Sequence, residues 1–180
     1  MSLVSTDWLY NNIDKVKIFD SSWHLPNENR NAFEEYKKGH IQGSIFFDID
    51  KYSDKKSDLP HMLPSKEEWE LFMSSLGISN DDIIVIYDDS HLISSCRCWY
   101  TFLYFGHNQN SVFILDGGLK KWKNENRETV KSIMNVSKTK YFATENKKLV
   151  KNKIEIDQNI LKKKFKVLDA RSKKRFEGKE

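Results

Sequence analysis

The opening of this chain recurs near its end, and this internal repeat most constrains what the chain can fold into. Residues 7–10 and 16–21 read Asp-Trp-Leu-Tyr and Val-Lys-Ile-Phe-Asp-Ser. Residues 157–161 and 165–170 read Asp-Gln-Asn-Ile-Leu and Phe-Lys-Val-Leu-Asp-Ala. Each copy is typical of a short helix followed by a buried strand that ends on an aspartate and a small residue. We therefore expect two related units with the same beginning.

The spacing of the repeat corresponds to one domain. Asp20 and Asp169 are 149 positions apart, which is far longer than the period of a solenoid repeat, about 20 to 50 residues. A second unit of that size would extend past Glu180. We therefore expect residues 1–125 to form a complete domain, residues 126–156 a linker, and residues 157–180 the start of a truncated second domain.

Strand and helix signals alternate along the first domain, which is typical of a parallel α/β sheet. The run Ile-Ile-Val-Ile-Tyr at 83–87 favours a central strand covered on both faces. Further apolar strand signals lie at 16–19, 45–47 and 112–115. The predicted fold class is α/β, an open parallel sheet flanked by helices.

Two helices are predicted among these strands. Ser65 followed by Glu68 is a capping box, and Gly77 is placed to end the helix that the box begins. The second helix covers residues 94–105, and Gly106 closes it. The first helix has apolar side chains at helical spacing, which predicts that they pack in the core: Trp69, Phe72, Met73 and Leu76.

Composition favours a reducing compartment. The chain has two cysteines without framework spacing. Its N-terminus shows no basic segment followed by an apolar one, and no apolar run approaches the ~18 residues that a membrane span needs. We expect a cytoplasmic protein with no membrane partner.

The net charge of +4 comes from lysines spread through the chain. The densest stretch, residues 162–166, contains one aromatic residue, Phe165. It therefore lacks the interleaved aromatic side chains typical of nucleic-acid binding, and we predict solvated lysines and no nucleic-acid partner.

The predicted linker lies in a polar, lysine-rich region from residue 123 to residue 155. A few apolar residues interrupt it. We expect four of them to anchor it against the first domain: Tyr141, Phe142, Leu149 and Val150.

Several motifs occur together in the order found in one protein family. They are Asp20, residues 39–44, 85–88, 97–100, 105–107, 115–118 with Trp122, and then 141–142, 149–150, 168–171 and 175–178. Together they resemble the two-domain sulfurtransferases, thiosulfate sulfurtransferase (rhodanese) and 3-mercaptopyruvate sulfurtransferase. The chain resembles the N-terminal rhodanese domain, the linker and the first strand of the second domain.

This resemblance implies a fold and an activity. Each domain is a rhodanese-like open parallel sheet, and the C-terminal domain is the catalytic one. A cysteine at the start of the loop after its central strand lies in a cradle of backbone N–H groups, where its thiolate takes sulfur as a persulfide. The intact enzyme would move sulfur from mercaptopyruvate or thiosulfate, both small anionic donors, to a thiol or cyanide. No cofactor is implied.

Asp88 stands where the resemblance places the nucleophile. A carboxylate cannot take up sulfane sulfur, and Asp89 beside it adds to the repulsion of an anionic donor. We expect Asp88 and Asp89 to cap the following helix or to neighbour the second domain. The chain alone is therefore predicted to be inactive, with no catalytic residue, and the repeat offset places a catalytic cysteine near position 237, beyond Glu180.

Cys96 is the alternative nucleophile because it lies in the first turn of the predicted helix at 94–105, where the helix dipole could activate it. It lies eight positions after Asp88, too late for the loop. Cys98 is two positions further along the helix, so the two side chains point to different faces and are poorly placed for a disulfide or a metal.

Arg175 is the one position to which the resemblance carries a functional role. In the family, the arginine before the Phe-x-Gly segment binds the anionic substrate, which suits the always-charged, planar guanidinium. Without its partner loop, Arg175 would be one more solvated base in Lys173-Lys174-Arg175.

His40 and Arg97 complete the candidates. His40 lies in a turn flanked by glycines, so we expect a hydrogen bond that fixes the turn. Arg97 is either a salt-bridge partner at the domain face or an ordinary residue of the helix surface. The other histidines show no spacing typical of metal ligands, and we predict no metal site.

Two alternatives to the sulfurtransferase hypothesis were weighed. One is a stand-alone rhodanese-like module that has lost its chemistry and binds or regulates a partner. The other is a phosphatase-like relative, which needs a cysteine in the loop after the central strand. Asp88 at that position argues against the phosphatase.

Overall fold

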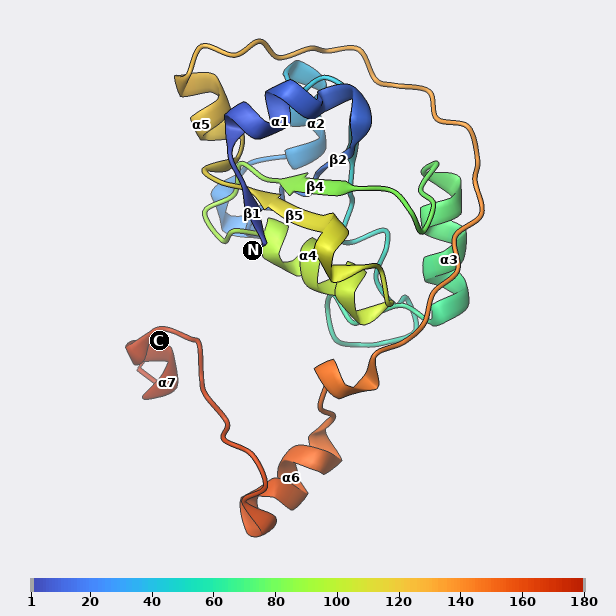
Figure 1. The fold of residues 1–180 in the computed structure, drawn as a ribbon. Helices are drawn as coiled ribbons and strands as arrows, with labels where there is room; N and C mark the ends of the chain where they lie inside the picture. The colour runs from blue at the N-terminus through green and yellow to red at the C-terminus, as the bar shows by residue number, and fades with distance from the viewer. Residues whose placement is uncertain (1, 180) are drawn as a thin grey trace. The chain divides into compact units, whose positions relative to one another are not determined.

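The computed structural model describes residues 2–179. Met1, the first residue of the predicted first domain, and Glu180, the last residue of the predicted second repeat, lie outside the described residues. The chain divides into two compact units, Met1–Asn146 and Lys147–Glu180 (Figure 1). Each unit is described by itself.

The first unit is built on one sheet of five strands, and every pairing between neighbours is parallel. The order across the sheet is β1-β5-β4-β2-β3. The strands are β1 (Leu3–Val4), β2 (Lys17–Asp20), β3 (Ser44–Phe46), β4 (Ile84–Tyr87) and β5 (Val112–Leu115). The predicted α/β fold with an open parallel sheet is confirmed.

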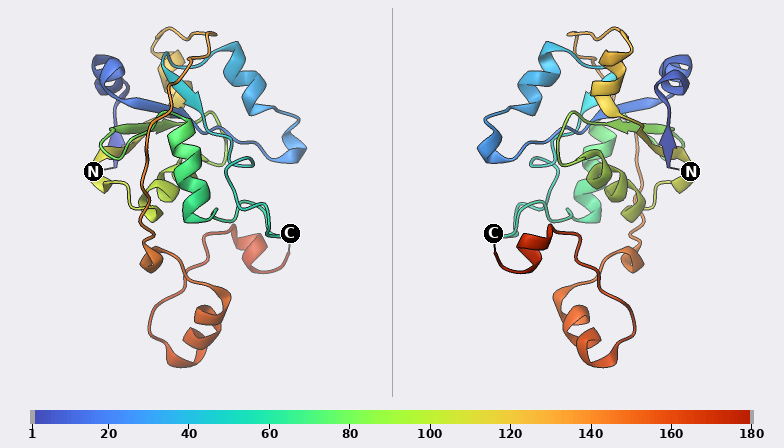
Figure 2. Two further views of the ribbon diagram at one scale, coloured as in Figure 1. Left: turned by 90° about the vertical axis from the view of Figure 1, so that its right-hand side faces the viewer. Right: turned by 90° about the vertical axis from the view of Figure 1, so that its left-hand side faces the viewer.

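Helices cover both faces of the sheet. The five α-helices of this unit are α1 (Thr6–Asn12), α2 (Ala32–Lys38), α3 (Lys66–Ser75), α4 (Ser95–Tyr104) and α5 (Gly118–Asn124). Short 3-10 turns occur at Ile13–Lys15, Pro26–Glu28 and Gln109–Ser111. Helices α1, α2 and α5 lie on one side of the sheet, and α3 and α4 lie on the other (Figures 1 and 2).

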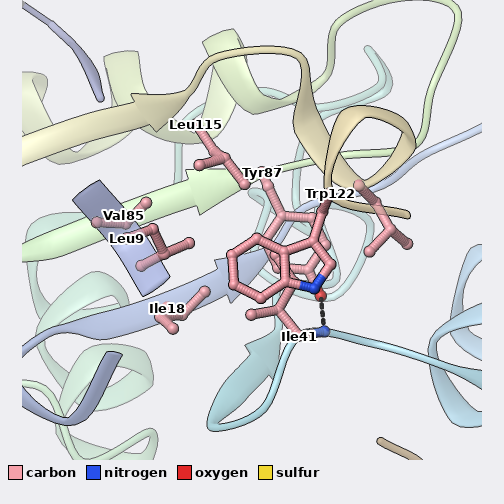
Figure 3. Close-up of a cluster of buried hydrophobic side chains, with 8 residues drawn as sticks. Leu9, Ile18, Ile41, Val85, Tyr87, Leu115 and Trp122 are labelled. Carbon is pink, nitrogen blue, oxygen red and sulfur yellow. Dashed lines mark hydrogen bonds between the residues drawn. The ribbon is translucent and has the colours of Figure 1, made fainter. Parts of the chain in front are cut away.

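Strand β4 is the central strand that the β-branched run predicts. All four of its side chains are fully buried, and each such burial stabilises the fold by about 1.5–3 kcal/mol. Val85 and Tyr87 belong to the apolar cluster that includes Leu9 of α1 and Trp122 of α5 (Figure 3). The Tyr87 hydroxyl accepts a hydrogen bond from the Ile41 backbone N–H at 3.2 Å, which ties this cluster to the turn before β3.

The predicted capping box starts α3. The Ser65 hydroxyl accepts from the Glu68 N–H at 3.2 Å, and the Glu68 carboxylate accepts from the Ser65 N–H at 2.9 Å. Gly77 follows the helix with φ +70°, the left-handed conformation that glycine adopts without strain. Trp69 and Met73 are fully buried as predicted, while Phe72 and Leu76 are half-buried.

Residues 127–146, which we call the strap, run along the first unit without regular secondary structure. The Thr139 N–H donates to the Ser74 carbonyl at 3.0 Å, and the Thr144 N–H donates to the Phe105 carbonyl at 2.9 Å. Tyr141 is 3% exposed, so its predicted anchoring is confirmed. The prediction for Phe142 was wrong.

Phe142 is 69% exposed, and Ala143 is buried beside it. The Asn80 side chain pairs with both backbone groups of Phe142, at 2.7 and 2.9 Å. In an extended segment, successive side chains point to opposite sides. Burial of Tyr141 and Ala143 therefore turns Phe142 to solvent. The other two expected anchors, Leu149 and Val150, belong to the second unit.

The second unit contains a 3-10 turn at Lys147–Leu149 and two helices, α6 (Lys153–Lys162) and α7 (Lys173–Phe176). The predicted helix at 157–161 is part of α6, which a capping box of Asn152 and Glu155 starts. The strand predicted at 165–168 does not form, and Leu168 is 89% exposed. A strand needs a hydrogen-bonded neighbour, and residues 147–179 contain no strand with which it could pair.

Gly106 allows the strap to approach α4, and its replacement should release it. A Cβ at Gly106 would lie 2.6 Å from the Thr144 carbonyl oxygen, with φ at +79°. We expect Gly106→Ala to lower the free energy of unfolding by about 2–4 kcal/mol, from left-handed strain together with the clash. The matched control is Gly43→Ala, where φ is +74° and the Cβ meets open space. Equal losses in urea denaturation would contradict this account.

Trypsin should remove the second unit before it cuts the first. No apolar side chain is buried among residues 147–179, so little burial offsets the ~1–2 kcal/mol per residue needed to order the backbone. Limited digestion followed by mass spectrometry should show early cleavage at the lysines beyond 147 while residues 1 to about 130 persist. Equal protection of both regions would refute this prediction.

Candidate functional site

The candidate site lies at the carboxyl ends of β2 and β4, which are neighbours in the sheet. The chain leaves β2 towards β3 on one side and leaves β4 towards β5 on the other. Such a switch point is where open α/β sheets bind ligands. Asp20 at the end of β2 pairs in register with Tyr87, and Asp88 follows directly.

Asp88 caps α4. This is the first of the two roles predicted for it, the other being a position next to the second domain. Its Oδ2 atom accepts from the Ser95 backbone N–H at 2.6 Å, and Oδ1 accepts from the Ser90 N–H at 3.5 Å. The N-cap residue Ser94 provides no side-chain cap of its own. The partial positive charge of a helix N-terminus favours an anion. Here the protein's own carboxylate occupies that position.

Asp89 is held in a different way. The Arg30 guanidinium donates to the Asp89 carbonyl at 3.2 Å and makes two bonds to Glu35 of α2, at 2.7 and 2.9 Å. The bidentate pair with Glu35 lowers the pKa of that carboxyl. Sequence reasoning missed Arg30, since nothing in the local pattern shows that its guanidinium meets the loop after β4.

A concavity of about 430 Å³ opens beside this loop, bounded by the loops that follow β4 and β5 and by the start of α4. Its charged side chains have both signs: Arg30, Asp88, Asp89, Asp116 and Lys120. Cys96 also lines it, but the helix terminus does not activate this thiol. Burial, followed by the nearby Asp88 carboxylate, raises the pKa of Cys96.

Cys98 is fully buried, and this burial raises the pKa of its thiol well above the usual value. The thiolate is the reactive form of cysteine, so a raised pKa disfavours reactivity. The surroundings of Cys96 therefore argue against the alternative in which it is a dipole-activated nucleophile.

Asp20 is buried beneath the Asp88 loop. Its Oδ1 atom accepts from the Ser22 hydroxyl at 2.6 Å and from the Ser22 backbone N–H at 3.0 Å. Burial raises the pKa of Asp20 to about 6, although these two hydrogen bonds act in the opposite direction. The loop that follows β2 is therefore built on a carboxyl group that ionises at an unusually high pH.

His40 fixes its turn, as predicted. Its ring is buried, with Nδ1 2.7 Å from the Tyr36 carbonyl oxygen and Nε2 3.3 Å from the Ser132 carbonyl oxygen. Backbone bonds to Val130 add a bridge to the strap. His40 thus joins α2 to the strap and is not part of the site.

A second polar cluster, missed by sequence reasoning, lies on the loops after β2 and β3. Asp50 binds two rings: Oδ1 is 2.8 Å from His61 Nε2, and Oδ2 accepts from the Trp23 indole N–H at 3.1 Å. The Trp23 and His61 rings meet edge to face with centroids 4.9 Å apart. An imidazole held by a carboxylate is a group that can exchange protons with a ligand. No local sequence signal brings residues 23, 50 and 61 together.

Arg97 contacts this second cluster. Its guanidinium donates to the His61 carbonyl oxygen. One of the two expectations for Arg97 was a salt bridge, but this partner is a neutral backbone group. Burial lowers the pKa of Arg97. Arg97 is therefore neither an ordinary surface residue nor tied here to a carboxylate.

Arg175, the predicted substrate-binding residue, is exposed on α7 in the second unit. Its backbone N–H donates to the Ser172 hydroxyl at 3.3 Å. Nearby, Asp169 and Arg171 form an ion pair of 2.6 Å. The substrate-binding role of Arg175 stays a prediction.

Among residues 2–179, no group of three or more His, Cys, Asp and Glu side chains is arranged to hold a metal ion. Within the same residues, no helix has the length and apolar character to cross a membrane.

Comparison with known proteins defines the class. The family model for the rhodanese-like domain matches residues 5–125, and the chain belongs to this family. The sheet order and the covering helices are those of a rhodanese-like domain.

The relatives are sulfurtransferases. The chain is 36% identical to thiosulfate/3-mercaptopyruvate sulfurtransferase 2 of Arabidopsis thaliana, over 98% of this chain and 58% of that protein. It is 36% identical to mouse (Mus musculus) 3-mercaptopyruvate sulfurtransferase, over 98% of this chain and 62% of the relative. The crystal structure of SseA from Escherichia coli, described as a 3-mercaptopyruvate sulfurtransferase with the rhodanese fold, superposes with a TM-score of 0.91 at 32% identity, covering 98% of this chain and 68% of that one. The chain thus spans about six-tenths of the two curated relatives.

The raised pKa of Asp20 predicts a pH dependence of stability. Because the folded-state value of about 6 lies above the ordinary 3.8, the folded protein binds more protons than the unfolded chain between these values. Asp20 therefore favours the folded state most below about pH 4, and this contribution is lost as the pH rises through 6. In urea denaturation from pH 4 to 7, the free energy of unfolding of the natural protein should fall relative to Asp20→Asn by about 2–3 kcal/mol. If the free energies of unfolding of the two proteins changed in parallel with pH, the raised pKa of Asp20 would be contradicted.

Proposed function

We propose that the first unit is the non-catalytic domain of a two-domain sulfurtransferase, in which a second rhodanese-like domain carries the chemistry. The enzyme would transfer sulfur from 3-mercaptopyruvate or thiosulfate to a thiol or cyanide. The observation that supports this proposal is the Asp88 carboxylate, which accepts the Ser95 N–H at 2.6 Å. Asp88 follows the central strand, where the family resemblance places the nucleophile.

The proposed chemistry needs a thiolate. A cysteine thiolate attacks the sulfur of the donor, the C–S bond of mercaptopyruvate or the S–S bond of thiosulfate breaks, and pyruvate or sulfite leaves. The resulting persulfide passes its outer sulfur to the acceptor. In the first unit the helix terminus that would stabilise such a thiolate already holds a carboxylate, which can neither accept sulfur nor make room for an anionic donor.

The remaining roles fall on the second domain. We propose that Arg175 grips the anionic end of the donor, since a guanidinium forms a planar, charged fork. Residues 157–180 are proposed as the beginning of that domain, after a first domain at 1–125 and a linker at 126–156. A reducing compartment suits a thiolate enzyme, and we propose the cytoplasm.

The second candidate is a stand-alone rhodanese-like module that binds or regulates a partner. The observation in its favour is that the first unit has a continuous core of its own and fills its helix terminus internally. The transcript distinguishes the two candidates. A reading frame that continues to a cysteine near position 237, at the start of a loop after a β-branched strand, supports the enzyme. A stop codon directly after codon 180 supports the module.

The chain of 180 residues should have no sulfurtransferase activity of its own. Thiocyanate formation from thiosulfate and cyanide, and pyruvate release from mercaptopyruvate, should stay at background. Cys96→Ser is the control because Cys96 is the accessible thiol nearest the loop, and it should behave identically. Turnover that disappears in Cys96→Ser would overturn the assignment of the first unit as non-catalytic.

A further inference from the structure

The cluster of Trp23, Asp50 and His61 lies on long loops, yet its geometry is closely defined. Such a cluster needs support from a rigid element. The rigid element nearest in contact is α4, which reaches the cluster at two points. At one point a backbone N–H of the cluster donates to a serine in the loop just before this helix, and at the other an arginine of the helix donates to the cluster.

The first point of support is at Trp23. Its backbone N–H donates to the Ser90 hydroxyl at 2.9 Å, and this hydroxyl lies 2.8 Å from that of Ser94, the N-cap of α4. Ser94 in turn donates to the Ser21 carbonyl at 2.7 Å. The start of α4 therefore holds the loop that carries Trp23.

The second point of support is at His61. The Arg97 guanidinium donates to the His61 carbonyl oxygen, and the next carbonyl, that of Met62, accepts from the Asp54 N–H at 2.9 Å. His61 has φ +56°, a left-handed conformation that costs a non-glycine residue about 1–2 kcal/mol. Bonds to the two peptide groups that follow the Cα of this strained residue keep it in place.

A charged arginine side chain is a costly donor, in free energy, for a single backbone carbonyl. The guanidinium is half-buried, and its hydrogen bond here is to a neutral acceptor. Partial burial of a cation without a carboxylate costs some stability. The long reach of arginine and its forked N–H donors suit it for holding a loop at a distance.

We propose that Arg97 is a positioning residue for the His61–Asp50 pair. It holds the left-handed backbone of His61 so that Nε2 faces Asp50 and the ring packs on the edge of Trp23. The His61 side chain remains 26% exposed, so the oriented ring is accessible. Its use in proton exchange with a thiol rests on the proposed function; the positioning by Arg97 does not.

The test follows the His61 ring by NMR in the 180-residue protein, with every variant measured at the same fixed pH. In the natural protein the ring protons should show ring-current shifts and cross-relaxation with the Trp23 indole. In Arg97→Met both signatures should fall by at least about half, and Arg97→Lys, which keeps a charged donor, should restore most of them. Carbethoxylation of His61 should become several-fold faster in Arg97→Met.

Arg127→Met is the matched control. Arg127 is also largely buried, with its side chain 16% exposed, but it lies over Tyr10 and Trp122. Its loss should leave the His61 signals unchanged. A folded Arg97→Met protein with natural His61 signals would overturn the proposal, as would the same loss of signal in Arg127→Met. If Arg97→Met does not fold, Arg97→Gln, which keeps an N–H donor without the charge, is compared in the same way. Activity enters none of these outcomes, so they are independent of the proposed function.

Discussion

The structure depends on the pairing of β4 with a parallel strand on each edge. This pairing makes β4 the central strand, whose four side chains are buried beneath the helices on both faces of the sheet. It also places the carboxyl ends of β2 and β4 side by side. The buried carboxyl of Asp20 and the helix cap of Asp88 both result from it. Burial of β4 stabilises the domain, and the strand ends create the site.

The electrostatics of the site explain how the N-terminus of α4 is stabilised. An N-terminal helix terminus with free N–H groups attracts an anion. In this protein Asp88 supplies that charge from within the chain. The same carboxylate adds to burial in raising the pKa of Cys96. One side chain therefore both caps α4 and disfavours the thiolate of its neighbour.

Much of the fold was predictable because its signals are local. The capping box of Ser65 and Glu68 and the run at 84–87 act through nearest neighbours and burial, and both formed as predicted. The strand at 165–168 failed for the opposite reason. Its sequence matches that of β2, but a strand is stable only beside another strand, and residues 147–179 contain none.

The sequence by itself determined strands β2 to β5, helices α1, α3 and α4, and the position of Asp88 in the loop after the central strand, since these follow from periodicity and spacing along the chain. The tertiary structure alone decided that Asp50 meets His61 and Trp23, that Arg97 holds the His61 carbonyl, and that Arg30 reaches Asp89. These contacts join residues from separate loops and helices. Their geometry is set by the sheet that brings the loops together, and it leaves no pattern in the local sequence.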